Sequence, residues 1–251
     1  MWKRKESNFN NILKLMEFHY LTSHERSNMD INHIKSVHTE EVINTVCSTI
    51  NWNELIVNEQ LEMEKHEIFR KRRTSWDFNN CVDLSKLHAI LNIGLGVTEI
   101  VKYGTNIVHK RAYPSAGAEY TVNVHLIAKN IDKKIDNKVL RVNDDGLEVL
   151  HELNNYNFNE ICSSTKYGVK SFEDANVLIF LTIEFEKLFS KYGALSYRLA
   201  LLEAGHMAQN LQLVASNYNI KSVPLGGFYN EEVKSTLKLD TEECLYILAL
   251  G

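Results

Sequence analysis

Apolar side chains recur with two different periods along the chain, and the strand-like period dominates several short segments. Residues 121–128 alternate, which places Val122, Val124 and Leu126 on one core-facing side of a predicted strand. Residues 175–183 are almost continuously apolar, as is typical of a central strand buried on both faces. Shorter apolar runs predict two further strands, at residues 138–142 and 244–250.

Other segments show helical spacing. From Val82, a predicted helix runs to a glycine-containing stop, and its core-facing side comprises Leu84, Leu87, Ile90 and Leu91. The longest predicted helix covers residues 195–219, with an expected buried stripe of Leu201, Ala204, Ala208, Leu211, Ala215 and Tyr218. Gly205, in the middle of this helix, is about 1 kcal/mol less favourable than alanine. A glycine at this position predicts that another group packs closely against the helix there, where a side chain would exclude it. Further helices are predicted at residues 147–155, after the turn sequence NDDG, and at 230–239.

Strands interleaved with helices, without strict alternation, predict an α+β fold. Residues 70–251 are expected to form the main domain. Residues 1–69 are rich in Asn, Glu, His and Lys and are predicted to form an α-helical N-terminal appendage. Helical patterning within that appendage covers residues 10–21 and 39–50, with Thr39 as a candidate N-cap.

Composition narrows the function classes. The 251 residues carry 28 basic and 32 acidic side chains, for a formal charge of -4, which argues against nucleic acid or an anionic membrane as the main partner. The basic N-terminus lacks a signal-peptide apolar region, and no run of 18 apolar residues occurs. The cysteines Cys47, Cys81, Cys162 and Cys244 show no metal-ligand spacing. We therefore expect a cytoplasmic protein with free thiols and no metal site.

Two clusters of small residues are candidate ligand-binding turns. PSAGA (residues 114–118) precedes a strand, and SVPLGGF (residues 222–228) lacks the spacing of a dinucleotide-binding fingerprint. Backbone amides in such turns can face a ligand, although a plain turn is the alternative for each.

Six motifs, taken together and in chain order, carry a family resemblance. They are KRRTSWDF (71–78), RAYPSAGAEY (111–120), KYG (191–193), EAGHMAQN (203–210), VPLGGF (223–228) and LYILALG (245–251). In combination they resemble the nitroreductase-fold flavoproteins, and more narrowly the SagB-type dehydrogenases, FMN-dependent azoline oxidases of peptide-modifying pathways. Residues 18–27 also resemble the histidine-containing N-terminal helix of that subfamily. The resemblance implies a homodimer whose central, mostly antiparallel sheet is flanked by helices, with FMN at the subunit interface.

The resemblance also implies which residues bind FMN. Arg72 and Arg73 match an arginine pair that meets the flavin phosphate or pyrimidine edge, and a guanidinium suits bidentate phosphate contact; a solvated basic run is the alternative. Ser75 matches the following hydroxyl position. Two turns are expected to lie against the flavin, the first through Pro114, Ser115 and Gly117 and the second through Pro224, Leu225, Gly226 and Gly227. His206 and Gln209, one helical turn apart, are candidates beside the flavin, with a buried structural histidine as the alternative for His206.

Lys191 and Tyr192 match the Lys-Tyr pair of azoline dehydrogenases. Azole formation removes a proton from the α-carbon of the azoline and a hydride from its β-carbon. A lysine can accept that proton near neutral pH if its surroundings lower its pKa from about 10.4 toward 7 or 8. Tyr192 would orient the lysine or relay the proton. From the dipeptide alone, an ordinary surface pair that follows a loop remains the alternative.

The resemblance therefore implies oxidation of thiazoline or oxazoline rings to azoles in a ribosomally made precursor peptide, beside a cyclodehydratase partner. Two alternatives stay open. One is another flavin-dependent reductase, acting on a nitro compound, a quinone or a dehydroamino acid. The other is a flavin-free scaffold subunit of a peptide-modifying complex.

Overall fold

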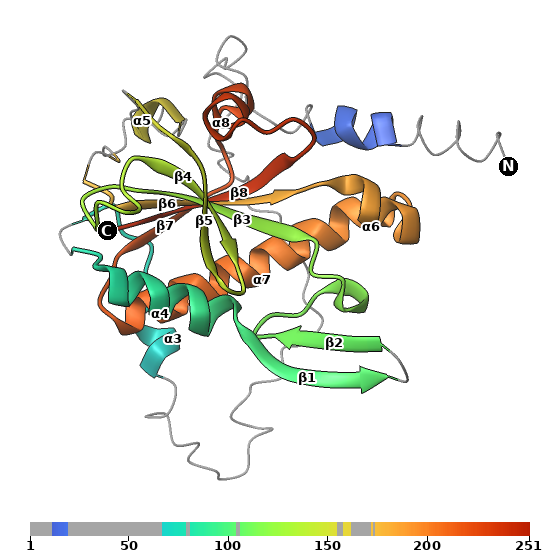
Figure 1. Cartoon of the computed structure of the whole chain (residues 1–251), viewed down its shortest axis with the longest axis horizontal. Helices are drawn as coiled ribbons and strands as arrows, with labels where there is room; N and C mark the ends of the chain where they lie inside the picture. Colours follow the sequence, from blue (N-terminus) through green and yellow to red (C-terminus); the bar gives the residue numbers. More distant parts are fainter. Residues whose placement is uncertain are drawn as a thin grey trace, which may run out of the picture.

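A six-stranded antiparallel sheet forms the centre of the computed structural model, which describes residues 12–19, 67–78, 81–103, 106–154, 158–161, 172 and 174–251 (Figure 1). The strand order is β5-β4-β3-β6-β8-β7, and every neighbouring pair is antiparallel. The strands are β3 (Val122–Ala128), β4 (Lys138–Asn143), β5 (Gly146–Glu152), β6 (Val177–Ile183), β7 (Ser222–Leu225) and β8 (Glu243–Leu250). The predicted α+β fold with an antiparallel sheet is confirmed.

Helices cover both faces of this sheet. One face packs against α4 (Leu84–Leu95), α6 (Phe185–Tyr192) and the long helix α7 (Leu195–Asn217), and the other against α5 (Phe158–Ile161) and α8 (Asn230–Leu237). The alternation of β6 explains the two cores, because Ile179 and Leu181 face α7 whereas Leu178 and Phe180 face the α8 side. Every residue of β6 is buried, as predicted for a central strand.

A second, two-stranded sheet was not predicted. β1 (Val97–Tyr103) and β2 (Asn106–Arg111) form an antiparallel hairpin that extends from the main body (Figure 1). The sequence VTEIVKYGTNIVHKR does contain the signal, since two β-branched runs flank a Gly-containing turn.

Three predicted elements are wrong. Residues 147–155 were expected to be helical, but residues 147–152 belong to β5, because the NDDG turn folds them back onto β4 with Asn143 opposite Gly146. Residues 222–225 of the expected turn form β7, which pairs with β8. The segment before Lys191, expected to be a loop, is the helix α6, which ends at Gly193 in the left-handed region (φ 57°).

The expected helix faces are partly correct. Of the predicted stripe on α7, Ala204, Ala208, Leu211 and Ala215 are buried. Leu201 and Tyr218 are exposed instead, because the buried side of the helix is completed by Ala200, Met207 and Val214. On α4, Leu84 is likewise exposed.

The N-terminal region is described in two short pieces. Residues 12–19 form a helix, which confirms that part of the predicted pattern, and α3 (Glu67–Lys71) precedes the main domain. The predicted helix at 39–50, with its Thr39 cap, and the residues Cys47 and Cys162 lie outside the described residues. Within the part of the chain that the structure describes, every helix is too short or too polar to cross a membrane.

Candidate functional site

The PSAGA turn is held to α7 by a buried carboxylate. The Ser115 hydroxyl donates to Oε2 of Glu203 at 2.5 Å and accepts the Tyr120 backbone N–H at 2.8 Å. The other carboxylate oxygen, Oε1, accepts the Val122 backbone N–H at 3.1 Å. One side chain of α7 thereby fixes both the turn and the first residue of β3.

Glu203 is only 2% exposed. Its burial raises the pKa of the carboxyl group, and the hydrogen bonds from Ser115 and from backbone amides oppose that shift. Sequence reasoning missed Glu203. The signal was a single acidic residue beside Ala204 and Ala208, on the side of the predicted helix that was expected to be buried.

The backbone of this turn is unusual for the residues it contains. Gly117 has a φ of 61°, and the non-glycine residues Ala118 and Tyr120 also have positive φ values of 55° and 47°. Positive φ disfavours side chains with a Cβ, so the hydrogen bonds of Ser115 must hold the turn in this form.

Lys191 and Tyr192 lie directly against Gly117. A Cβ at that position would overlap the Tyr192 hydroxyl and lie 2.9 Å from Nζ of Lys191. The Lys191 Nζ stands 5.4 Å from the centroid of the Tyr192 ring. The structure therefore brings together the first predicted flavin turn and the predicted catalytic pair, although Gly117 and Lys191 are 74 positions apart in the sequence.

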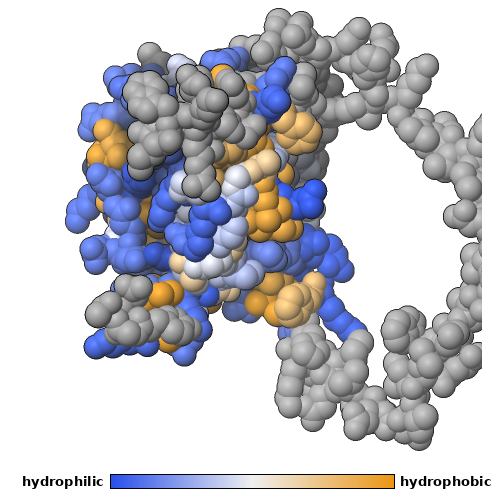
Figure 2. Space-filling model, turned by 90° about the vertical axis from the view of Figure 1, so that its right-hand side faces the viewer, coloured by the Kyte–Doolittle hydropathy of each residue, from blue (hydrophilic) through white to orange (hydrophobic). Residues whose placement is uncertain are grey.

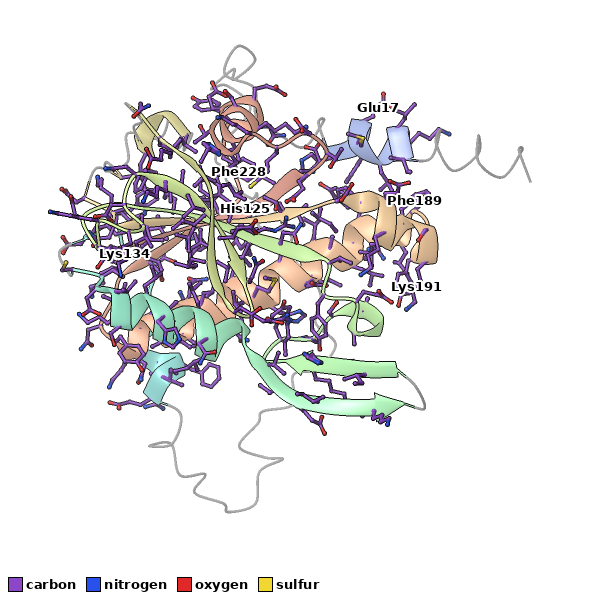
Figure 3. All side chains as sticks on the ribbon, in the orientation of Figure 1. Glu17, His125, Lys134, Phe189, Lys191 and Phe228 are labelled. Atoms are coloured by element: carbon purple, nitrogen blue, oxygen red, sulfur yellow. The ribbon has the colours of Figure 1, made fainter. Side chains whose placement is uncertain are left out.

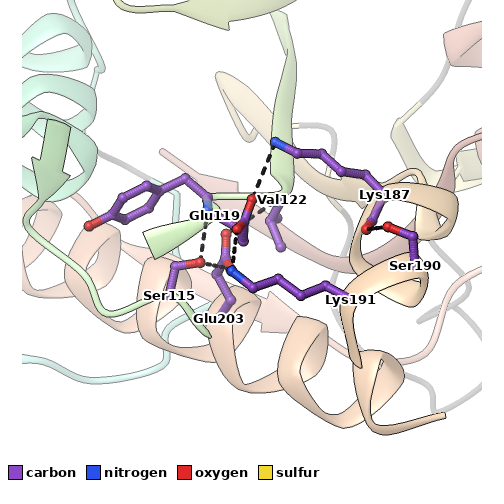
Figure 4. Close-up of polar contacts among 8 residues, drawn as sticks. Ser115, Glu119, Val122, Lys187, Ser190, Lys191 and Glu203 are labelled. Atoms are coloured by element: carbon purple, nitrogen blue, oxygen red, sulfur yellow. Dashed lines mark hydrogen bonds and ion pairs between the residues drawn. The ribbon is translucent and has the colours of Figure 1, made fainter. Parts of the chain in front are cut away.

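Lys191 forms an ion pair that the sequence did not predict. Its Nζ donates to Oε1 of Glu119 at 2.6 Å (Figure 4). This hydrogen bond raises the pKa of Lys191, and the Tyr192 phenol adds to the effect. Burial opposes this shift, but the side chain is 46% exposed and the hydrogen bond to Glu119 outweighs the opposing effect. With Glu119 in contact, the pKa of Lys191 therefore moves away from the lowered value that a lysine base needs.

The second group of predicted flavin ligands gathers around β7. Thr74 forms a parallel bridge with Ser222, and the Ser75 backbone N–H donates to the Ser222 carbonyl at 3.1 Å. This pairing places Arg72, Arg73 and Ser75 beside the start of β7, the strand that also carries Pro224 and Leu225.

Within this second group, some side chains are exposed and others are buried. Arg73 is exposed and donates to the Arg72 carbonyl at 2.7 Å, whereas Arg72 and Ser75 are half-buried. Leu225 packs into the core on the α8 side, so only its backbone is available to a ligand. Gly227 is half-buried. At Gly226 no described heavy atom lies within 4 Å of where a Cβ would stand, which leaves room over the backbone.

The exposed side of α7 carries the remaining candidates. His206 and Gln209 are exposed, so the alternative of a buried structural histidine is wrong. Leu201 and Leu202 on the same helix are 42% and 53% exposed. No described heavy atom lies within 4 Å of a Cβ built on Gly205, so the described chain does not itself supply the close approach that was expected there.

The two groups of candidates lie at opposite ends of the molecule. Figure 1 shows α6 at the right-hand end of α7 and α3 at its left-hand end, and Figure 3 places Lys191 at the right-hand edge. Along the axis of α7, Glu203 and Asn217 are about 21 Å apart at a rise of 1.5 Å per residue. The candidate residues of one chain thus form two separate groups.

Comparison with known proteins identifies the protein family to which this chain belongs. A model of the nitroreductase family matches residues 70–251, so the chain belongs to this family of oxidoreductases. A Methanocaldococcus jannaschii protein named as a nitroreductase is 26% identical over 200 residues, which cover 76% of this chain and 91% of that protein. The microcin B17-processing protein McbC of Escherichia coli is 30% identical over 141 residues, which cover 52% of this chain and 49% of McbC.

Solved structures agree on the fold. A chain of the E. coli microcin synthetase McbBCD complex, with truncated pro-MccB17 bound, matches with a TM-score of 0.63 at 20% identity and covers 96% of this chain and 92% of that one. A Ralstonia eutropha structure named as a nitroreductase matches with a TM-score of 0.58 at 16% identity, covering 78% of this chain and 86% of that one. The predicted nitroreductase-like fold is confirmed.

Proposed function

We propose that the protein is an FMN-dependent dehydrogenase that oxidises thiazoline or oxazoline rings to azoles in a ribosomally made peptide. The observation that carries this proposal is the contact between Gly117 and the Lys191–Tyr192 pair. It joins a turn expected to lie along a flavin to a basic group and a phenol that an ordinary flavin reductase would not need. The likeness to McbC, which processes a peptide, supports the same substrate class.

The residues present fit FMN. The guanidinium groups of Arg72 and Arg73 suit its phosphate, and the free space over Gly226 would let a flat ring approach the backbone. FMN held by these residues would supply the hydride acceptor that oxidation of the azoline ring needs, with oxygen as the final oxidant. Backbone amides in the second turn would stabilise negative charge on the reduced cofactor.

Two copies of the chain would complete each flavin site. The PSAGA turn with Lys191 lies at one end of α7, and Arg72 with Arg73 lies near the other. A second copy whose α7 runs antiparallel to the first would bring together one group from each copy. The exposed Leu201, Leu202 and Gly205 on α7 are suited to that contact. On the face that carries α6, Figure 2 shows apolar surface between hydrophilic areas.

The chain's own groups would move the proton. Lys191, once neutral, would take the proton from the α-carbon of the ring, and Tyr192 would orient the amine through its hydroxyl. A cyclodehydratase would supply the azoline, since the dehydrogenase needs a ring that is already closed. The McbBCD structure, a complex with a truncated propeptide bound, supports an assembly of this kind.

A second function within the flavin class is reduction of small acceptors with NAD(P)H. The raised pKa of Lys191 favours it, because a protonated amine cannot act as a base. Turnover of a nitro compound or quinone that persists in Lys191→Ala would identify this alternative.

The test is a visible absorption spectrum of purified protein before and after FMN is added and the excess removed. The proposal predicts flavin bands, and their loss together with dimer dissociation in Leu202→Glu. Absence of bound flavin after reconstitution would contradict the proposal and favour a scaffold role. Leu13→Glu, an exposed apolar position on the helix of residues 12–19, is the matched control for adding a surface charge.

A further inference from the structure

Two lysines of α6 share one carboxylate. Lys191 lies 2.6 Å from Oε1 of Glu119, and Lys187 lies 3.6 Å from Oε2 of the same residue (Figure 4). The lysines are four residues apart and therefore lie on the same side of the helix. Lys187 is 69% exposed, so its contact is the looser of the two.

Glu119 reaches α6 because of the turn that precedes it. Ala118 and Tyr120 on either side have positive φ values, and the Tyr120 N–H is held by Ser115. This backbone aims the Glu119 side chain at the end of α6. Its position is therefore set by the same Ser115–Glu203 anchor that holds the predicted flavin turn.

We propose that Glu119 is a positioning residue for Lys191, holding the amine over Gly117 and competing with the substrate for it. This inference rests on the proposed function, in which Lys191 is the base. The groups that face the amine are the Glu119 carboxylate from the turn and the Tyr192 phenol from α6, with Lys187 on the far oxygen of Glu119.

The sign of the effect follows from the charges. An ammonium group beside a carboxylate keeps its proton to higher pH, so Glu119 lowers the fraction of Lys191 that is neutral and able to accept a proton. Lys187 draws on the same carboxylate and weakens this effect. Removing the Glu119 charge should make the Lys191 amine more reactive, whereas removing the Lys187 charge should make it less reactive.

The first test uses trace acetylation of the dimeric protein with acetic anhydride at a fixed, mildly alkaline pH, read out by peptide mass spectrometry. Glu119→Gln keeps the side-chain size, and we expect Lys191 to be acetylated several-fold faster in it. Lys187→Gln is the matched control and should slow acetylation of Lys191. Equal rates at Lys191 in wild type and Glu119→Gln would overturn the proposal, whatever the protein oxidises.

The second test is the pH dependence of azoline oxidation. The acid limb should move to lower pH in Glu119→Gln and to higher pH in Lys187→Gln, a pair of opposite shifts that a purely structural role would not produce. If Lys191 is acetylated faster in Glu119→Gln but the acid limb of azoline oxidation does not move, the claim that Glu119 controls the reacting amine is overturned. If Lys191 is acetylated faster in Glu119→Gln but the wild-type protein forms no azole, the Glu119–Lys191 assignment is kept and the proposed function is contradicted.

Discussion

Ser115 and Glu203 are hydrogen-bonded at 2.5 Å although 88 residues of sequence separate them. This bond ties the turn before β3 to the middle of the longest helix. It explains how three residues with positive φ can be held beside Lys191 and Tyr192.

Replacing Glu203 with Ala should lower the free energy of unfolding. The change leaves the buried Val122 N–H without its acceptor, at a cost of about 1–3 kcal/mol. Urea denaturation of wild type and Glu203→Ala measures the difference in the free energy of unfolding. Ser115→Ala should cost a similar amount, because it leaves Oε2 of the buried Glu203 without its donor and the Tyr120 N–H without its acceptor. Equal stability of Glu203→Ala and wild type would contradict the anchoring role.

Replacing Gly117 with Ala should displace the Lys191–Tyr192 pair. The new Cβ meets the Tyr192 hydroxyl, and its positive φ adds roughly 1–2 kcal/mol of strain. We expect lower thermal stability and loss of ring oxidation. Ala118→Gly is the matched control, because it relieves positive φ at the next residue and should stay within about 1 kcal/mol of wild type. Full activity in Gly117→Ala would show that the contact is dispensable.

The helix of residues 12–19 should be released when its histidine anchor is lost. His19 Nδ1 lies 3.0 Å from the Tyr197 hydroxyl, and the Tyr197 ring stacks on Phe185 at the start of α6. Hydrogen exchange should show faster opening of residues 12–19 in His19→Ala and not in the surface control Leu13→Ala. Unchanged exchange would contradict the anchor.

The same anchor should weaken in acid. Burial lowers the pKa of His19, and Lys234 adds to this, while Glu243 opposes it. The docked state therefore binds fewer protons than the released state, so docking is favoured above the ordinary histidine pKa of about 6.5 and is lost as pH falls below it. Exchange of residues 12–19 should accelerate over that range in wild type.

A second acid-sensitive group lies on the other face of the sheet. Burial alone would raise the pKa of Glu242, but hydrogen bonds from His125 and Thr182 outweigh it and lower the pKa to about 2. Figure 3 shows His125 near the centre of the sheet. The resulting stability is present above the ordinary value of 4.5 and is lost as pH falls toward about 2, amounting to about 3 kcal/mol. Glu242→Gln should flatten this part of the stability profile, and an unchanged acid slope would contradict the assignment.

Sequence periodicity was sufficient where one face of an element is buried. It located β3 and α7 because their apolar positions follow the backbone period, whereas β6 was recognised as a continuous apolar run buried on both faces. It failed for β5, where Leu147 and Leu150 also fit helical spacing and only pairing with β4 decides the outcome.

The candidate site was predictable as motifs and not as geometry. Gly117, Lys191 and Tyr192 were found by resemblance, and their contact follows from the fold. Glu119 and Glu203 were missed because of the sequence distance to their partners. Lys191 is about 70 residues from Glu119 and Ser115 is about 90 residues from Glu203, beyond the reach of local patterns. The raised pKa of Lys191 could not be foreseen without Glu119.

The central claim is that this protein oxidises azoline rings and uses Lys191 to do so. The most direct measurement is mass spectrometry of an azoline-containing peptide incubated with FMN-loaded wild type, and with Lys191→Ala and Lys187→Ala as a matched pair. We predict loss of two hydrogen atoms per ring with wild type and, more slowly, with Lys187→Ala, and no loss with Lys191→Ala despite retained flavin. An unchanged peptide with flavin-loaded wild type, or equal oxidation by Lys191→Ala, would contradict it.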